Sequence, residues 1–305
     1  MKRVEKHLVP ILRYAAVVSI TACTFGTSRL MAQTAPKIET VLTLPQETNG
    51  QTENITEGPD GSIYVTAAFD RTLWKIKNAK AERFFTATGI TAISGVAWER
   101  DEVVVNGLTK FPPPVPGQRG FAPNAEFGSH ALILDKSGNV KATVPGHDPQ
   151  LFNGLARAGD HWYLITDTTG GQVLSLDTRT HALETWIQDP QLRMNGIKVN
   201  KGWVYLTSGD NVFRVEIGLD RKPKGGAELF AQGAPTDDFG MAPDGTLYLP
   251  SGRTMVKISP SRQRSVFLSD IETENSPAAW VTRDGKWLYW TERAGPAKVK
   301  RVALK

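Results

Sequence analysis

The sequence predicts an all-β fold, a six-bladed β-propeller of four-stranded blades around a central channel. Three observations predict it. Six segments share one pattern of a polar residue, a turn and short apolar strands; the segments recur about every 40 residues; and apolar and polar residues alternate with the period of two that strands require. Six such units leave no room for a separate domain. We therefore expect a leader at residues 1–32 and a single propeller domain at residues 33–305.

Each repeat begins with a polar residue at the head of an apolar strand. The intervals between these positions are 41, 42, 42 and 39 residues, with one exception of 59 residues in the second repeat. The excess coincides with an insert at residues 106–129, which contains Pro112-Pro113-Pro114 and has no strand periodicity. We expect this insert to be a loop. The six equivalent positions are Glu53, Ser94, Asn153, Asn195, Asp237 and Ser276.

Strand ends and turns complete the expected architecture. The segment 38–44 is apolar and precedes the first repeat, so we expect it to pair with the last blade and close the ring, which would hide two sheet edges. Asp-Gly pairs such as Asp60-Gly61 separate successive strands, because glycine supplies the positive φ that tight hairpins need. A helical solenoid is a poor alternative because the apolar runs are too short.

The first residues are typical of an export signal. A basic stretch ending at Arg13 precedes the apolar run 14–22, which is too short to span a bilayer as a mature helix. Two processing sites compete: cleavage after Ala32, or lipidation of Cys23 in a lipoprotein-like box. Both predict a periplasmic or extracellular protein. Cys23 is the only cysteine, so an intramolecular disulfide and Cys-based catalysis or metal binding are excluded.

The basic charge of the chain depends on the leader. The net charge is +5, and removal of residues 1–32 takes away five positive residues and one negative residue, which leaves about +1. The body of the chain contains no Lys/Arg cluster with interleaved aromatic residues, so a nucleic acid is discounted as a partner. We expect a small-molecule substrate instead.

The six polar positions are expected to meet, because the innermost strands of a propeller start beside the channel. Glu53, Asn153, Asn195 and Asp237 offer two carboxylates and two amide oxygens, which suit Ca²⁺ first and also Mg²⁺ or Mn²⁺. Zn²⁺ suits them less well because no His or Cys falls in register. Two close carboxylates would also repel each other without a cation. The competing interpretation is that Asn-Gly and Asp-Asp are turn residues entering each blade.

The repeat register decides between two candidates for the first acidic ligand. Glu53 lies eight residues before Gly61, and Asp237 lies eight residues before Gly245. Glu57, which stands beside a Gly-Pro pair, is out of phase with the other repeats. The register therefore favours Glu53.

Three segments carry a resemblance to a known family: Asn153-Gly154-Leu155-Ala156, Asn195-Gly196-Ile197 and Asp237-Asp238-Phe239. They resemble the SMP-30/gluconolactonase/LRE-like family of six-bladed propellers, and the resemblance covers essentially the whole chain after the leader. The Glu-Gly-Pro run typical of that family occurs here at residues 57–59, four residues late.

The resemblance implies a reaction and roles for individual residues. Glu53, Asn153, Asn195 and Asp237 would surround a divalent metal that polarises the carbonyl of a lactone or ester, and Asp237 would also activate water. Asp238 is a reserve candidate for either role of Asp237. Since one propeller scaffold hosts many functions, a non-catalytic propeller that binds a ligand or protein is the alternative.

The remaining candidates concern substrate contacts. Ser94 and Asn153 are expected to face the substrate. The insert is either a lid, with Arg119, Phe121 and Asn124 over the pocket, or a surface insertion.

Other polar residues give no competing active site. His161, on an expected strand, is interpreted as structural. A triad of Ser94, His130 and Asp167 lacks a nucleophile-elbow sequence, and Asp167 is interpreted as a turn residue.

Overall fold

The computed structural model describes residues 36–45, 51–78, 80–112, 125–234, 237–269, 271, 276–293 and 296–304. The expected leader with Cys23 and Ala32 lies outside the described residues, as do Arg119, Phe121 and Asn124 of the insert. The described residues form 24 strands and no helix. None of them therefore belongs to a helix with the length and apolarity that crossing a membrane requires.

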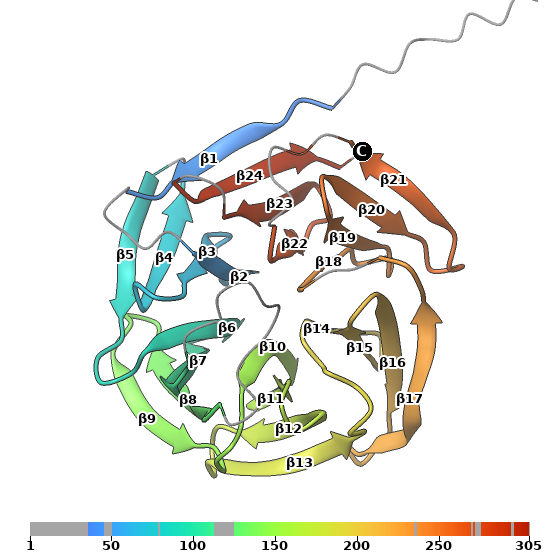
Figure 1. Ribbon diagram of the computed structural model, residues 1–305. Helices are drawn as coiled ribbons and strands as arrows, with labels where there is room; N and C mark the ends of the chain where they lie inside the picture. Colours follow the sequence, from blue (N-terminus) through green and yellow to red (C-terminus); the bar gives the residue numbers. More distant parts are fainter. Residues whose placement is uncertain are drawn as a thin grey trace, which may run out of the picture. The chain divides into compact units, whose positions relative to one another are not determined.

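Six antiparallel four-stranded sheets follow one another around a ring in chain order (Figure 1), which confirms the predicted six-bladed propeller. The strands of blade 1 are β2 (Thr52–Glu57), β3 (Ile63–Ala67), β4 (Thr72–Lys77) and β5 (Lys80–Thr86). Those of blade 2 are β6 (Ala92–Glu99), β7 (Glu102–Lys110), β8 (Gly128–Asp135) and β9 (Val140–Pro145). Those of blade 3 are β10 (Phe152–Gly159), β11 (Trp162–Asp167), β12 (Gln172–Asp177) and β13 (Ala182–Gln188).

The second half of the ring repeats this order. Blade 4 contains β14 (Ile197–Asn200), β15 (Trp203–Ser208), β16 (Asn211–Ile217) and β17 (Pro223–Ala231). Blade 5 contains β18 (Gly240–Met241), β19 (Leu247–Ser251), β20 (Thr254–Ile258) and β21 (Arg264–Leu268). Blade 6 contains β22 (Ala279–Val281), β23 (Trp287–Glu292), β24 (Lys298–Ala303) and β1 (Glu39–Thr43). In every blade the first strand listed lies nearest the channel.

The ring is closed by the strand that precedes the first repeat. β1 pairs antiparallel with β24 and becomes the outermost strand of blade 6, as predicted. The Nε atom of Arg301 donates a hydrogen bond to Glu39 at 2.9 Å across this pair. Just beyond β1, Leu44 is buried, and its amide donates to the carbonyl of Ala297 at 2.8 Å. Both ends of the propeller are therefore held in one sheet, and β24 is not left as an open edge.

The insert in blade 2 is shorter than residues 106–129. Residues 106–110 continue β7 and residues 128–129 begin β8, with Asn106 paired to Ala131 and Leu108 paired to Ser129. The side chain of Leu108 is buried, which explains why the strand extends to this point. The connection between the two strands consequently spans residues 111–127.

The core lies between neighbouring blades. One buried cluster joins Trp162 and Val173 of blade 3 to Ile197 and Val204 of blade 4, and similar clusters join other neighbours. Because alternate residues of each strand point to opposite faces, every blade buries both faces against its neighbours. This packing holds the innermost strands in place, and so it positions the residues at their starts.

Candidate functional site

Five of the six equivalent positions line one pocket at the start of the innermost strands. Glu53 lies in β2, Ser94 in β6 and Asn153 in β10, whereas Asn195 precedes β14 and Asp237 precedes β18. The cavity has a volume of about 470 Å³. Residues separated by up to 184 positions in the chain are thus brought together, because each blade repeats the same path from the channel outward.

Threonines on the second strand of several blades hold this arrangement. Thr166 Oγ1 accepts a hydrogen bond from the amide of Gly154 at 2.7 Å and donates to the carbonyl of Asn195 in the next blade. Thr207 does the same one blade later, accepting from Gly196 at 2.7 Å and donating to the carbonyl of Asp237 at 2.6 Å. Each hydroxyl therefore ties one blade to the site residue of its neighbour.

The glycine after each asparagine permits this close approach. A Cβ atom on Gly154 would lie 2.4 Å from the carbonyl oxygen of Asn195, and one on Gly196 would lie 2.8 Å from that of Asp237. The turn interpretation of the Asn-Gly pairs is therefore incomplete, because these glycines also make room for the backbone of the next site residue.

One wall of the pocket is apolar. It includes Phe69, Leu108, Phe111 and Phe152, and the rings of Phe69 and Phe111 lie with their centroids 5.7 Å apart. Phe111 belongs to the connection between β7 and β8, so the beginning of the insert borders the pocket. Polar groups on the floor beside an apolar wall are typical of sites for small organic molecules.

Arg293 places a guanidinium group between the two acidic residues. It follows β23 in blade 6, lines the pocket, and forms an ion pair with Glu53. One of its Nη atoms lies 3.7 Å from Oδ2 of Asp237, and its Nε donates to the carbonyl of Thr52 at 2.9 Å. The side chain is 18% exposed, so this cation is largely shielded from solvent.

Asp237 is an unusually weak acid in this setting. Desolvation in the pocket and the negative charge of Glu53 raise its pKa to about 7, although Arg293 and a hydrogen bond from Asn195 act in the opposite direction. A carboxylate with such a pKa exchanges its proton near neutral pH.

The donors in the pocket fit a hard divalent ion by their chemistry. Glu53 and Asp237 provide carboxylates and Asn153 and Asn195 provide amides, all lining one cavity. The mutual repulsion that raises the pKa of Asp237 is also what a cation would relieve. Arg293 already supplies one positive charge beside Glu53 and Asp237, and the repeat pattern does not predict this charge.

Ser94 and Asn153 line the pocket, whereas Ser276 is not among the residues that line it. The hydroxyl of Ser94 donates to the carbonyl of Phe152 at 2.7 Å, and the Nδ2 atom of Asn153 lies 3.4 Å from Oγ1 of Thr168. Asp167 is fully buried at the end of β11 and accepts the amide hydrogen of Leu151 at 2.9 Å. Asp167 is therefore the last residue of a strand and not the turn residue that the sequence indicated, because its buried carboxylate accepts backbone hydrogen bonds there.

Asp238 is buried and is not among the residues that line the pocket. Its two carboxylate oxygens both lie 2.6 Å from Nζ of Lys198, and Asn54 donates to one of them at 2.9 Å. Burial raises the pKa of Asp238, while the ammonium group of Lys198 lowers it. The side chains of Asp238 and Lys198 are 4% and 8% exposed, so this ion pair is buried.

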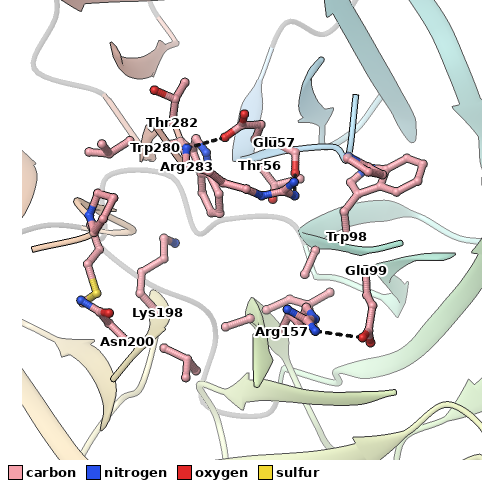
Figure 2. A pocket seen from close by; sticks show the side chains of 18 of the residues that line it. Thr56, Glu57, Trp98, Glu99, Arg157, Lys198, Asn200, Trp280, Thr282 and Arg283 are labelled. Carbon is pink, nitrogen blue, oxygen red and sulfur yellow. Dashed lines mark hydrogen bonds and ion pairs between the residues drawn. The ribbon is translucent and has the colours of Figure 1, made fainter. Parts of the chain in front are cut away.

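A second cavity, of about 620 Å³, opens at the ends of the innermost strands (Figure 2). Lys198, Arg157 and Arg283 lie around it together with Glu57 and Glu99. Arg157 pairs with Glu99 at 3.0 Å, and the amide of Arg283 donates to Glu57 at 2.7 Å. The structure therefore places Glu57 at this opposite mouth, away from the residues that share a pocket with Glu53.

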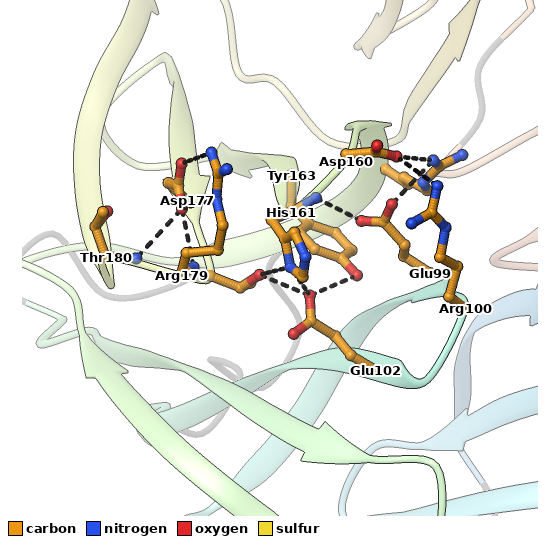
Figure 3. Close-up of polar contacts among 11 residues, drawn as sticks. Glu99, Arg100, Glu102, Asp160, His161, Tyr163, Asp177, Arg179 and Thr180 are labelled. Carbon is orange, nitrogen blue, oxygen red and sulfur yellow. Dashed lines mark hydrogen bonds and ion pairs between the residues drawn. The ribbon is translucent and has the colours of Figure 1, made fainter.

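A third polar group joins blades 2 and 3 (Figure 3). Glu99, Glu102 and His161 bring potential ligand atoms within 4.8 Å of one another and could hold a metal ion. His161 lies in the turn before β11, not within a strand as expected, with φ of 53°. Its amide donates to Glu99 at 2.7 Å, and Thr178 donates to Glu102 at 2.6 Å. The ring of His161 joins this group through Nδ1, which lies 3.3 Å from Oγ1 of Thr178.

The repeat pattern does not predict that Arg293 lies in the pocket, although the sequence contains an indication of it. It lies two residues after Thr291, and the positions two residues after Thr66, Thr166 and Thr207 are occupied by small residues: Ala68, Thr168 and Gly209. A long cation where these three blades have a small residue would have identified it as a pocket residue.

The fold and this pocket define a six-bladed propeller with a polar site at one mouth of its channel. Solved structures of the same fold include a gluconolactonase from Xanthomonas campestris, with 12% identity, a TM-score of 0.65, and coverage of 88% of this chain and 90% of that chain. A calcium-binding regucalcin from Agrobacterium tumefaciens has 11% identity, a TM-score of 0.60, and coverage of 86% and 94%. A virginiamycin B lyase from Staphylococcus aureus has 12% identity, a TM-score of 0.59, and coverage of 88% and 99%.

At these identities the likeness shows a shared fold. No protein-family model matches the chain. No curated protein sequence matches it either. The expected resemblance to gluconolactonase and regucalcin propellers thus holds for the architecture, and function has to be argued from the site.

Proposed function

We propose that the chain is an exported, metal-dependent hydrolase that acts on lactones or esters in the pocket containing Glu53 and Asp237. The observation that carries the proposal is the convergence of two carboxylates and two side-chain amides in a cavity of about 470 Å³ with an apolar wall. This arrangement suits a small, neutral, partly apolar substrate that carries one reactive carbonyl group. The likeness to a gluconolactonase supports the choice of lactones.

Each polar residue of the pocket receives a role. Glu53, Asn153, Asn195 and Asp237 would hold the divalent ion, with Ca²⁺ preferred on the chemistry of the donors. Such an ion, when bound, supplies Lewis acidity toward the substrate carbonyl. Ser94 and Asn153 line the side of the pocket where the substrate would lie.

Asp237 would take a proton from the attacking water at a carboxylate oxygen. The water oxygen adds to the carbonyl carbon, the ring C–O bond breaks, and Asp237 returns the proton to the departing alkoxide. Asp237 lines the same pocket as the other donors, and its carboxylate is therefore placed to accept and return this proton.

The test uses the purified protein after chelator treatment. Hydrolysis of a panel of five- and six-membered lactones and aryl esters is measured with Ca²⁺, Mg²⁺, Mn²⁺ or Zn²⁺ restored. We expect ion-dependent turnover, and a loss of at least about 100-fold in D237N, the size typical of losing a general base. D210N is the matched control, because Asp210 is an exposed turn residue outside the pocket. Unchanged activity in D237N would refute the role of Asp237.

A non-catalytic binding propeller is the second candidate, and one observation favours it. Lys198, which is paired with the buried Asp238, lines a second cavity of about 620 Å³ that the proposed reaction does not use and that could hold a ligand. Stoichiometric binding of a lactone with no turnover under any ion would favour this candidate.

The proposed export rests on the leader. Mass analysis of the mature protein separates its two forms: cleavage after Ala32 leaves an unmodified N-terminus, whereas lipidation at Cys23 adds the mass of acyl chains and anchors the protein to a membrane. An intact N-terminus in the native host would refute export through this leader.

A further inference from the structure

Arg293 is anchored in the position where the acidic residues of the pocket face each other. Its guanidinium group pairs with Glu53, and its Nε hydrogen bond to the carbonyl of Thr52 fixes the side chain from the backbone of β2. The same group lies 3.7 Å from Asp237. It therefore contacts the two carboxylates that a divalent ion would also require.

A guanidinium and a divalent ion compete for the same charge. The two carboxylates carry at most two negative charges, and the single charge of Arg293 neutralises part of them. An ion bound between the carboxylates while Arg293 stays in place would experience like-charge repulsion at short distance in a pocket largely shielded from solvent. Withdrawal of Arg293 would release both carboxylates, but it would break the ion pair with Glu53 and the bond to Thr52.

We propose that Arg293 is a built-in competitor for the divalent-ion site formed by Glu53, Asn153, Asn195 and Asp237. In the absence of the ion, the guanidinium holds the carboxylates together. Ion binding requires it to leave Glu53 and Asp237. The inference rests on the metal site of the proposed function, but it concerns ion affinity and is independent of the reaction.

The experiment measures binding of Ca²⁺ and Mn²⁺ by isothermal titration calorimetry on chelator-treated full-length protein, with thermal melts confirming that each variant folds. R293M and the polar variant R293Q are expected to bind at least about tenfold more tightly than the wild type, because the competing charge is removed. R293K retains a positive charge and should stay within a few-fold of the wild type. Addition of E53Q to R293M should abolish the gain.

The outcomes separate the two hypotheses. Equal affinity in the wild type, R293M and R293Q overturns the competition while leaving an ion site in place. Absence of binding in all variants overturns the ion site and, with it, the competition. A gain in R293K as large as that in R293M would show that the shape of the side chain matters and its charge does not, which also overturns the inference.

Discussion

Replacement of Lys198 by methionine should destabilise the propeller strongly and in a pH-dependent manner. Lys198 Nζ lies 2.6 Å from both carboxylate oxygens of Asp238, and the side chains are 8% and 4% exposed. The ammonium group also lies 5.3 Å from the ring centroid of Phe239 and 5.9 Å from that of Trp280. Methionine keeps an apolar stem of similar length beside these rings, so the substitution chiefly removes the charge.

The magnitude follows from what Asp238 does when its partner is lost. A buried carboxylate without a counterion takes up a proton, and burial already raises its pKa above the ordinary value of 3.8. At 1.36 kcal/mol per pKa unit, protonating such a group costs at most about 4 kcal/mol at pH 7 and at most about 1.6 kcal/mol at pH 5. K198M should therefore lose about 3–4 kcal/mol at pH 7, within the range for breaking a buried pair, and distinctly less at pH 5.

Denaturant unfolding followed by tryptophan fluorescence measures this difference, since the chain contains eight tryptophans. The double variant K198M/D238N removes both charges and should recover most of the loss, because Asn54 can still meet an amide at this position. A loss in K198M below about 1 kcal/mol at pH 7, or one that does not shrink at pH 5, would refute the reasoning.

Three further predictions follow from the site and from the ring. The pKa of Asp237 is about 7 in the folded protein and its ordinary value is 3.8, so the free energy of unfolding should fall as the pH rises between these values. D237N should lack this fall and should be more stable than the wild type by about 2–4 kcal/mol at pH 8 in chelator. Parallel stability curves for the two proteins would contradict this prediction. Gly154→Ala places a Cβ atom 2.4 Å from the carbonyl oxygen of Asn195 and should lower the free energy of unfolding by about 1–3 kcal/mol in denaturant unfolding. Gly226→Ala is the control, because Gly226 has open space around it, and it should cost less than about 1 kcal/mol. Equal effects of the two substitutions would refute the close-approach argument. Deletion of residues 36–45 removes β1 and exposes β24, so it should lower the melting temperature and promote aggregation on heating. An unchanged melting temperature would show that pairing of β1 with β24 is not needed for stability.

The fold could be predicted because its information is repeated six times. Each repeat carries a polar residue at the head of an apolar strand, so the register of one blade checks that of the others. This register places Glu53, and not Glu57, with Asn153, Asn195 and Asp237 in one pocket. The length of β7 could not be predicted in the same way, since residues 108–110 extend the strand beyond the point where β3, β11 and β15 end in their blades.

The two cations that pair with Glu53 and Asp238 could not be predicted from the repeat pattern, for a physical reason. A repeat specifies what is equivalent between blades, but a charge pair joins positions that differ. Arg293 reaches Glu53 from the last blade to the first, across 240 residues, and Lys198 reaches Asp238 across 40 residues between neighbouring blades. Only the ring places these residues together. The deviation of Arg293 from the small residues Ala68, Thr168 and Gly209 at equivalent positions is visible in the sequence, but the partner of Arg293 is not.

The two adjacent aspartates differ in their surroundings because each one faces a cation from a different blade. Asp237 and Asp238 are neighbours in sequence, but Asp237 lines the pocket beside Arg293 of blade 6, and Asp238 is paired with Lys198 of blade 4. Asp237 remains 29% exposed and is accessible to a ligand, whereas Asp238 is 4% exposed and already paired. Asp238 therefore cannot replace Asp237 in the pocket as their sequence suggests, because its carboxylate is buried and already bound to Lys198.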